Sequence, residues 1–175
     1  IDPVRGSVDR AVVTHGHADH ARSGHGAVLA TPETLAIMDA RYGEDFTANR
    51  QPIEYGETVE INGVTVWLSP AGHVLGSAQV VVEWKGLRMV CTGDYKRRRD
   101  PTCRAFEPVP GTHVFISEAT FGLPVFTWAP ESEVASQVNR WWADNAANGR
   151  FSLLGAYSLG KAQRVLSLLD PSIAP

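Results

Sequence analysis

The sequence predicts an α/β protein in which strands dominate the first two-thirds of the chain. Two pairs of apolar, β-branched segments flank the short turn sequences Asn62-Gly63 and Lys85-Gly86, and such pairs are typical of hairpins. Thr31-Pro32-Glu33 has the composition of a helix start. Between residues 130 and 149 the apolar residues change to helical spacing. A hairpin-rich part is therefore followed by a shorter part in which helix and strand patterns alternate.

The elements of the first part can be justified in chain order. Ala11-Val12-Val13 and residues 26–30 are short apolar runs, which predicts two buried strands. A helix is expected from residue 32 to about 41, because Thr31 can cap it, an acid lies in its first turn and Gly43 can end it. Strands are expected at residues 58–61, 64–68, 78–84, 87–92 and 114–116.

The second part is expected to begin near residue 125, where Gly122-Leu123-Pro124 interrupts the strand pattern. A helix is predicted between residues 130 and 149, because Val134, Val138 and Trp141 fall on one helical face. A strand at 151–154 and a helix at 160–169 are expected to follow. The predicted domains are residues 1–125 and 126–175.

Composition limits the class of protein. The 175 residues are 43% hydrophobic and carry a formal net charge of -3, which fits one soluble globular core and argues against a broadly basic nucleic-acid binder. Cys91 and Cys103 are too few for a disulfide framework, which favours the cytoplasm. No signal peptide or membrane-spanning run is found, so no membrane partner is expected. The chain starts at Ile1 without methionine, so we expect a fragment of a longer protein.

A metal site is predicted in the segment Thr14–His20, directly after the first strand. His15 and His17 are two residues apart, so in extended backbone both can reach one ion from the same side. Asp19 and His20 follow small residues that allow a tight bend, which suggests a second ion beside the first. Imidazole and carboxylate are ligands for zinc, or for manganese and iron.

The spacing H-x-H-x-D-H after a strand resembles the metallo-β-lactamase family. His73, in the glycine-bracketed loop 69–77, and Asp94, at a strand end, resemble the third and fourth metal motifs of its phosphodiesterase branch. The resemblance implies an αββα sandwich, here incomplete, and two divalent ions, zinc or alternatively manganese. The ligands implied for the first ion are His15, His17 and His73; those for the second are Asp19 and His20, with Asp94 between the two ions.

Later motifs resemble the β-CASP nucleases of that family. Glu118, in Ser117–Gly122, matches their first motif, and residues 155–163 look like the G-K-x-Q element of their inserted domain, which would begin at residue 126. Residues 93–103 and 118–124 are similar to the bacterial ligase-associated DNA exonucleases. The resemblance implies DNA phosphodiester hydrolysis in repair by a water that two metals activate, with Asp19 and Glu118 as catalytic residues. An ATP-dependent DNA ligase and a helicase are the implied associates.

The β-CASP pattern also has two later motifs, usually histidines, and none follows His113 here, so the second metal site is expected to be incomplete. Lys96, Arg97, Arg98 and, at a predicted helix start, Lys161 are candidate nucleic-acid contacts. A charge run is otherwise usually a solvated face. The alternatives are an RNA-processing nuclease of the same subgroup, a thioester or lactam hydrolase, a scaffold with a vestigial site, and a nucleotide-binding loop at residues 155–161.

Overall fold

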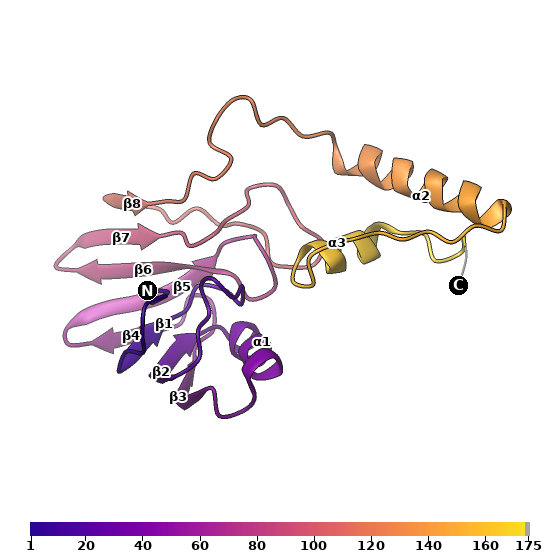
Figure 1. Cartoon of the computed structure of the whole chain (residues 1–175). Helices are drawn as coiled ribbons and strands as arrows, with labels where there is room; N and C mark the ends of the chain where they lie inside the picture. Colours follow the sequence, from indigo (N-terminus) through magenta and orange to yellow (C-terminus); the bar gives the residue numbers. More distant parts are fainter. Residues whose placement is uncertain (174–175) are drawn as a thin grey trace. The chain divides into compact units, whose positions relative to one another are not determined.

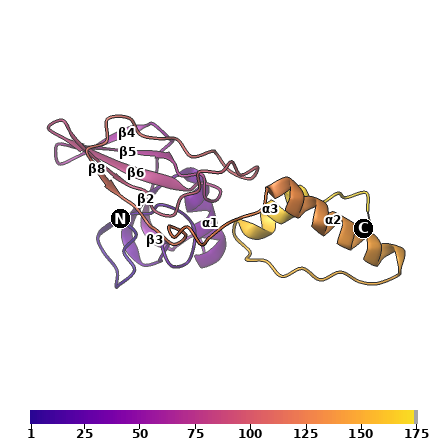
Figure 2. The same cartoon turned by 90° about the horizontal axis from the view of Figure 1, so that it is seen from above.

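A computed structural model describes residues 1–173 of the chain. It contains two compact units, Ile1–Glu118 and Ala119–Pro175, and each is described by itself. Figures 1 and 2 show that the strands lie in the first unit and that the second contains helices α2 and α3. No helix among the described residues is both long enough and apolar enough to cross a membrane.

The first sheet of unit 1 has three parallel strands in the order β1-β2-β3, with bounds Arg10–Val12, His25–Ala30 and Thr47–Pro52. Helix α1, Pro32–Tyr42, connects β2 to β3. Its start is as predicted, since the Thr31 side chain accepts a hydrogen bond from Thr34 N–H and Pro32 is the first helical residue. Gly43 ends the helix at φ 89°, as expected of a glycine C-cap.

The second sheet has five strands in the order β4-β5-β6-β7-β8. Their bounds are Thr58–Ile61, Val64–Pro70, Ala78–Trp84, Leu87–Cys91 and Val114–Ile116. The first four strands pair antiparallel, and β8 pairs parallel with β7. Both predicted hairpin turns are confirmed, because Asn62-Gly63 and Lys85-Gly86 all have positive φ, as a two-residue turn of type I′ requires.

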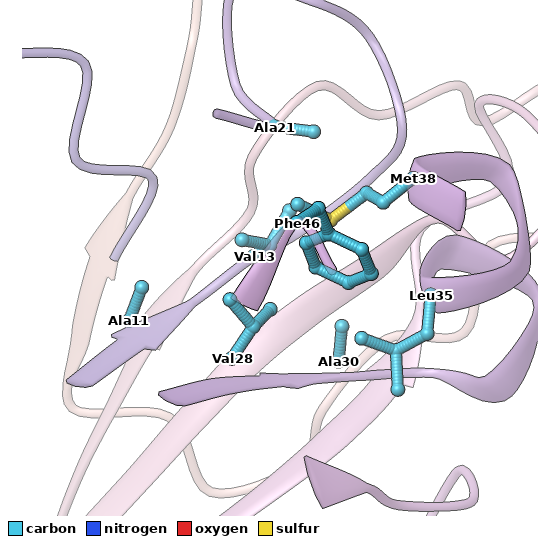
Figure 3. Packing of buried hydrophobic residues seen from close by; sticks show 8 residues of the cluster. All are labelled: Ala11, Val13, Ala21, Val28, Ala30, Leu35, Met38 and Phe46. Atoms are coloured by element: carbon cyan, nitrogen blue, oxygen red, sulfur yellow. The ribbon is translucent and has the colours of Figure 1, made fainter. Parts of the chain in front are cut away.

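Two hydrophobic cores hold unit 1 together. In the first core, Leu35 and Met38 of α1 pack with Val13, which directly follows β1, and with Val28 of β2, as Figure 3 shows from close by. In the second core, residues of β2 and of β5 and β6 meet between the two sheets, with Leu29 on the opposite face of β2 from Val28. Unit 1 is thus layered helix, sheet, sheet, and the central strand β2 of the inner sheet is buried on both faces, which explains its uninterrupted apolar run.

The ends of β1, β5 and β7 are followed by the loops that carry the predicted metal ligands. The two sheets are joined at this edge by a backbone hydrogen bond of 2.8 Å from Ala78 N–H to the Thr14 carbonyl. This junction brings the loop after β1 close to the start of β6, and therefore close to the loop that joins β5 to β6.

Unit 2 contains α2, Glu131–Ala147, and α3, Lys161–Leu168, both near their predicted positions. Asn139 ties them together: its side-chain N–H donates to the Leu168 carbonyl and its side-chain oxygen accepts from Asp170 N–H, each at 3.0 Å. The strand predicted at 151–154 is wrong, since this segment has no strand assignment. The apolar run has no neighbouring strand in the described part of unit 2 with which its backbone could pair.

Candidate metal centre

Four side chains converge at the edge where β1, β5 and β7 end. The converging atoms are Nε2 of His15, Nδ1 of His17, Nε2 of His73 and Oδ2 of Asp94. His17 Nδ1 lies 3.0 Å from His15 Nε2 and 3.2 Å from His73 Nε2. Asp94 Oδ2 lies 3.8 Å from His15 Nε2 and 3.6 Å from His73 Nε2. All four can offer a ligand atom within 4.8 Å of the others.

The donor set fits a zinc-type cation. Zinc–nitrogen bonds of about 2.0–2.1 Å in a tetrahedron place neighbouring ligand atoms roughly 3.3 Å apart, and the measured separations lie on either side of this value. Lone pairs of neutral imidazoles repel one another at such distances unless a proton or a cation lies between them. Three imidazoles and one carboxylate are also the chemistry that zinc prefers.

A chain of hydrogen bonds orients His15. Its Nδ1 lies 3.0 Å from the Thr14 hydroxyl, which lies 2.7 Å from Oδ2 of Asp2. Because the hydroxyl donates its proton to the Asp2 carboxylate, it accepts a hydrogen bond from His15 Nδ1–H. The lone pair of His15 is therefore on Nε2, the atom that faces His17 and Asp94.

A second group of possible ligands lies on the other side of Asp94. His20 Nε2 is 3.4 Å from Asp94 Oδ1 and 3.8 Å from Asp19 Oδ2. The other ring nitrogen, Nδ1, is 2.9 Å from Asp2 Oδ2 and donates its proton there. The two Asp94 oxygens therefore face different groups: Oδ2 faces His15 and His73, whereas Oδ1 faces His20.

The pKa values of these groups are shifted in different directions. Burial, followed by repulsion from neighbouring imidazoles, lowers the pKa of His15, and burial lowers the pKa of His73. Hydrogen bonds to Asp2 and then to Asp94 raise the pKa of His20 to about 10. The hydrogen bond from His20 lowers the pKa of Asp94. His15 and His73 are thus poised to offer lone pairs, whereas a cation at His20 must displace a proton.

The backbone of the motif bends after its first histidine pair. The carbonyl of His17 accepts hydrogen bonds from the N–H groups of His20 and Ala21, at 3.0 and 2.8 Å, which turns the second pair toward Asp94. Gly16 lies at a bend of the chain, as expected. It has a further role, because a Cβ at Gly16 would lie 2.5 Å from a methyl group of Ile37, so this glycine also allows close contact with α1.

The residues predicted to act in catalysis and in nucleic-acid binding differ in their exposure and in their distance from the ligand cluster. Asp19 is exposed beside His20, and the half-buried Glu118 lies close enough to His73 for its charge to raise the pKa of that imidazole. Arg97 and Arg98 are exposed on the loop after Asp94.

Lys96 is engaged within the protein. Its Nζ lies 2.7 Å from Oδ2 of the buried Asp100, and the other oxygen of this carboxylate accepts hydrogen bonds from the N–H and O–H of Thr102. The ammonium group therefore stabilises the loop after Asp94.

Lys161, in unit 2, lies with its ammonium 5.0 Å from the centre of the Tyr157 ring. Gly160 N–H, at the start of α3, donates to the side-chain oxygen of Gln163 at 2.8 Å, and the Gln163 amide donates to the Ser158 carbonyl. The turn that resembles a phosphate-binding loop is thus closed by its own glutamine.

Asp2 also contributes to this centre, although no sequence pattern predicted it. Its carboxylate accepts hydrogen bonds from Thr14 N–H, the Thr14 hydroxyl and His20 Nδ1–H. It contacts one ligand of each group, His20 directly and His15 through Thr14. Its sequence position offers no spacing signal, because the contacts cross 12 to 18 residues.

Comparison with known proteins identifies similar chains. Residues 5–134 match the family model of the metallo-beta-lactamase superfamily. A protein named probable DNA ligase from Opitutus terrae is 34% identical over 172 residues, covering 95% of this chain and 16% of the relative. Cleavage and polyadenylation specificity factor subunit 3-I from Arabidopsis thaliana is 32% identical, and the match covers 97% of this chain and 28% of the relative. Endoribonuclease YSH1 from Kluyveromyces lactis is 28% identical, and the match covers 94% of this chain and 26% of the relative.

This chain therefore spans less than a third of the length of each of these relatives. Among solved structures, a protein of unknown function from Enterococcus faecalis superposes with a TM-score of 0.53 at 11% identity, covering 77% of this chain and 39% of that one. This likeness concerns the fold alone.

Proposed function

Because this chain belongs to the metallo-β-lactamase superfamily, we propose that it carries the two-metal centre of a nuclease that hydrolyses phosphodiester bonds. The predicted fold class, an α/β sandwich of this family of which the chain holds part, is confirmed. The observation that carries the proposal is the division of the Asp94 carboxylate between two groups of ligands, with Oδ2 facing His73 and Oδ1 facing His20. A carboxylate whose two oxygens face two groups of ligands would be able to serve both ions of a two-metal site.

Each side chain has a role in this proposal. The first ion would be held by His15, His17 and His73, and the second by Asp19 and His20, with Asp94 shared. When bound, such ions neutralise a phosphate oxygen and lower the pKa of a water into the neutral range. The carboxylate of Asp19, exposed beside His20, would both hold the second ion and orient the attacking water.

Two other groups act toward the phosphodiester chain. Glu118 adds a carboxylate near His73, on the first-ion side of the centre. Arg97 and Arg98 attract the polyanion to the loop after Asp94, and their charges make binding depend on salt. An otherwise acidic chain has few such exposed cationic runs, which supports a local nucleic-acid surface.

The proposed substrate is DNA, degraded as an exonuclease in a repair pathway with an ATP-dependent ligase and a helicase. The similarity to a protein named as a probable DNA ligase, together with the motifs shared with ligase-associated exonucleases, supports this choice. In this assignment residues 126–175 begin the inserted β-CASP domain. The second candidate is an RNA-processing nuclease of the same subgroup, which the similarity to endoribonuclease YSH1 supports. The metal chemistry itself does not distinguish the sugars.

Metal analysis paired with a nuclease assay tests the proposal. The full-length protein, in which the second site is expected to be complete, is analysed for zinc and manganese and is then incubated with end-labelled DNA and RNA of matched sequence, with and without a chelator. Two ions per chain and DNA shortened progressively from one end are expected, with both lost in His17→Ala. Internal cleavage of RNA with intact DNA would favour the second candidate. Unchanged metal content in His17→Ala would contradict the assigned centre.

A further inference from the structure

Helix α1 contacts both loops that carry the ligands of the first ion. At its N-terminal end, the hydroxyls of Thr31 and Thr34 lie 2.8 and 3.0 Å from the carbonyl oxygen of Gly76. Both threonines are buried, and one carbonyl oxygen has two lone pairs with which to accept both hydrogen bonds. A Cβ at Gly76, where φ is 75°, would lie 2.8 Å from each hydroxyl oxygen, so only glycine permits this approach.

The Gly76 carbonyl is coupled to His73 through the next residue. The buried Ser77 hydroxyl accepts hydrogen bonds from His73 N–H at 3.0 Å and from Val74 N–H at 3.1 Å. Ser77 N–H in turn donates to the Val74 carbonyl at 2.9 Å. Residues 73–77 therefore form one closed turn, and a shift of Gly76 would be transmitted to the backbone of His73.

The C-terminal half of α1 holds the other ligand loop. Ile37 packs against Gly16, which lies between His15 and His17, and leaves no space there for a side chain. Arg41 Nη1 donates a hydrogen bond to the Gly16 carbonyl. Tyr42 adds a second anchor, because its hydroxyl donates to the Ala21 carbonyl at 2.7 Å, one residue after the motif.

We propose that α1 is a brace that sets the separation of the two ligand loops, with Thr34 and Arg41 as positioning residues for the first ion. Through this helix, Nδ1 of His17 and Nε2 of His73 are held 3.2 Å apart although 56 residues separate them in the chain. The inference rests on the proposed metal centre. The proposal gives Thr34 and Arg41 a role in metal binding that is separate from the packing of α1 on the hydrophobic core.

Thr34→Val is the most informative substitution. It keeps the shape of the side chain but removes one of the two donors to the Gly76 carbonyl, and it spares Thr31, which is the other donor and whose oxygen caps the helix. Outer hydrogen-bond partners of ligands typically contribute 10- to 100-fold to metal affinity. We therefore expect Thr34→Val to weaken zinc binding about 10-fold in a chelator competition and to change the absorption spectrum of the cobalt-substituted chain. Thr34→Ser, which restores the hydroxyl, should return both toward wild type.

Two further variants separate positioning from general stability. Leu35→Val shortens a buried side chain in the core beneath α1, so it should lower the melting temperature of the metal-free chain while leaving zinc affinity unchanged. Arg41→Met removes the donor at the other end of the helix and should weaken zinc binding as Thr34→Val does. Zinc affinity equal to that of the wild type in both Thr34→Val and Arg41→Met would overturn the proposed role of α1 but not the metal centre. A loss of zinc affinity in Leu35→Val as large as in these two variants would do the same. A wild-type chain that binds no zinc would instead refute the metal centre.

Discussion

The Oδ2 atom of Asp2 lies 2.9 Å from Nδ1 of His20, and this contact fixes the ring so that Nε2 faces Asp94. Asp2→Asn keeps the size of the side chain but removes the charge that holds the imidazole. We expect the second ion to bind about 10- to 100-fold more weakly, with a smaller loss at the first site through Thr14. Zinc titration monitored by calorimetry would separate the two sites.

The matched control for this variant is Asp9→Asn, an identical change at an exposed position of the same N-terminal segment. It should leave both binding steps as in the wild type. Equal affinities of the Asp2→Asn variant and the wild type at both sites would show that the Asp2 contact does not support the ligands.

The division of the Asp94 carboxylate gives a second prediction. In Asp94→Asn one oxygen is replaced by an amide nitrogen, which cannot ligate a cation. In the full-length protein, the metal content is expected to fall from two ions per chain to one or fewer. Phosphodiester hydrolysis should fall by more than about 100-fold, beyond the loss typical of an outer partner. Elemental analysis and a single-turnover assay would measure the two effects, with the exposed Asp45→Ala as control. Full metal content in Asp94→Asn would exclude a shared ligand.

The hairpins and α1 could be predicted because each is encoded within a few residues. Asn62-Gly63 sets both positive φ values of its turn, and Thr31 and Gly43 set the two ends of the helix. Strand β3, Thr47–Pro52, was not predicted, because its residues are polar and mostly exposed and it is held by backbone pairing to β2. Local patterns carry no information about such a partner.

The same limit applies to the candidate site. The spacing of the motif predicted His15 and His17 as ligands, whereas His73 and Asp94, which the structure places beside them, were predicted from the family resemblance. Asp2 and Thr34 were missed, since their contacts with His20 and Gly76 cross 18 and 42 residues and depend on how the sheets meet. The apolar pattern at 151–154 wrongly predicted a strand, because a strand forms only where another strand lies beside it, and sequence alone cannot establish that neighbour.

The basic run after Asp94 should divide into two kinds of residue. Arg97→Ala is expected to weaken nucleic-acid binding and to reduce the slope of log affinity against log salt by about 1, because one phosphate contact is lost. Lys96→Met should instead destabilise the protein by about 1–3 kcal/mol, since the buried Asp100 carboxylate loses its hydrogen bond from the Lys96 ammonium. Binding titrations at several salt concentrations and urea unfolding would distinguish them. A Lys96→Met variant with wild-type stability and a reduced salt slope would reverse this assignment.

Stability of the metal-free protein should be greatest near pH 6.5. Burial lowers the pKa of His15, His25 and His73, so below their unfolded value of 6.5 unfolding takes up protons and stability falls as pH falls. This loss should be visible between pH 6.5 and 5, above the range in which most carboxylates titrate. For His20 the sign is opposite. Its folded pKa is raised to about 10, so its contribution is complete below pH 6.5 and is lost as pH rises toward 10.

Melting temperatures measured in chelator from pH 5 to 10 would test both arms of this profile. The alkaline arm depends first on Asp2, so it should flatten in Asp2→Asn, whereas the acid arm should persist because the buried histidines are unchanged. A shift of about 2–4 °C is expected for each kcal/mol lost in a protein of this size. If the wild-type melting temperature stayed constant from pH 6.5 to 5, burial would not be holding the ligand histidines neutral. A cation would then have to displace protons from His15 and His73 in order to bind.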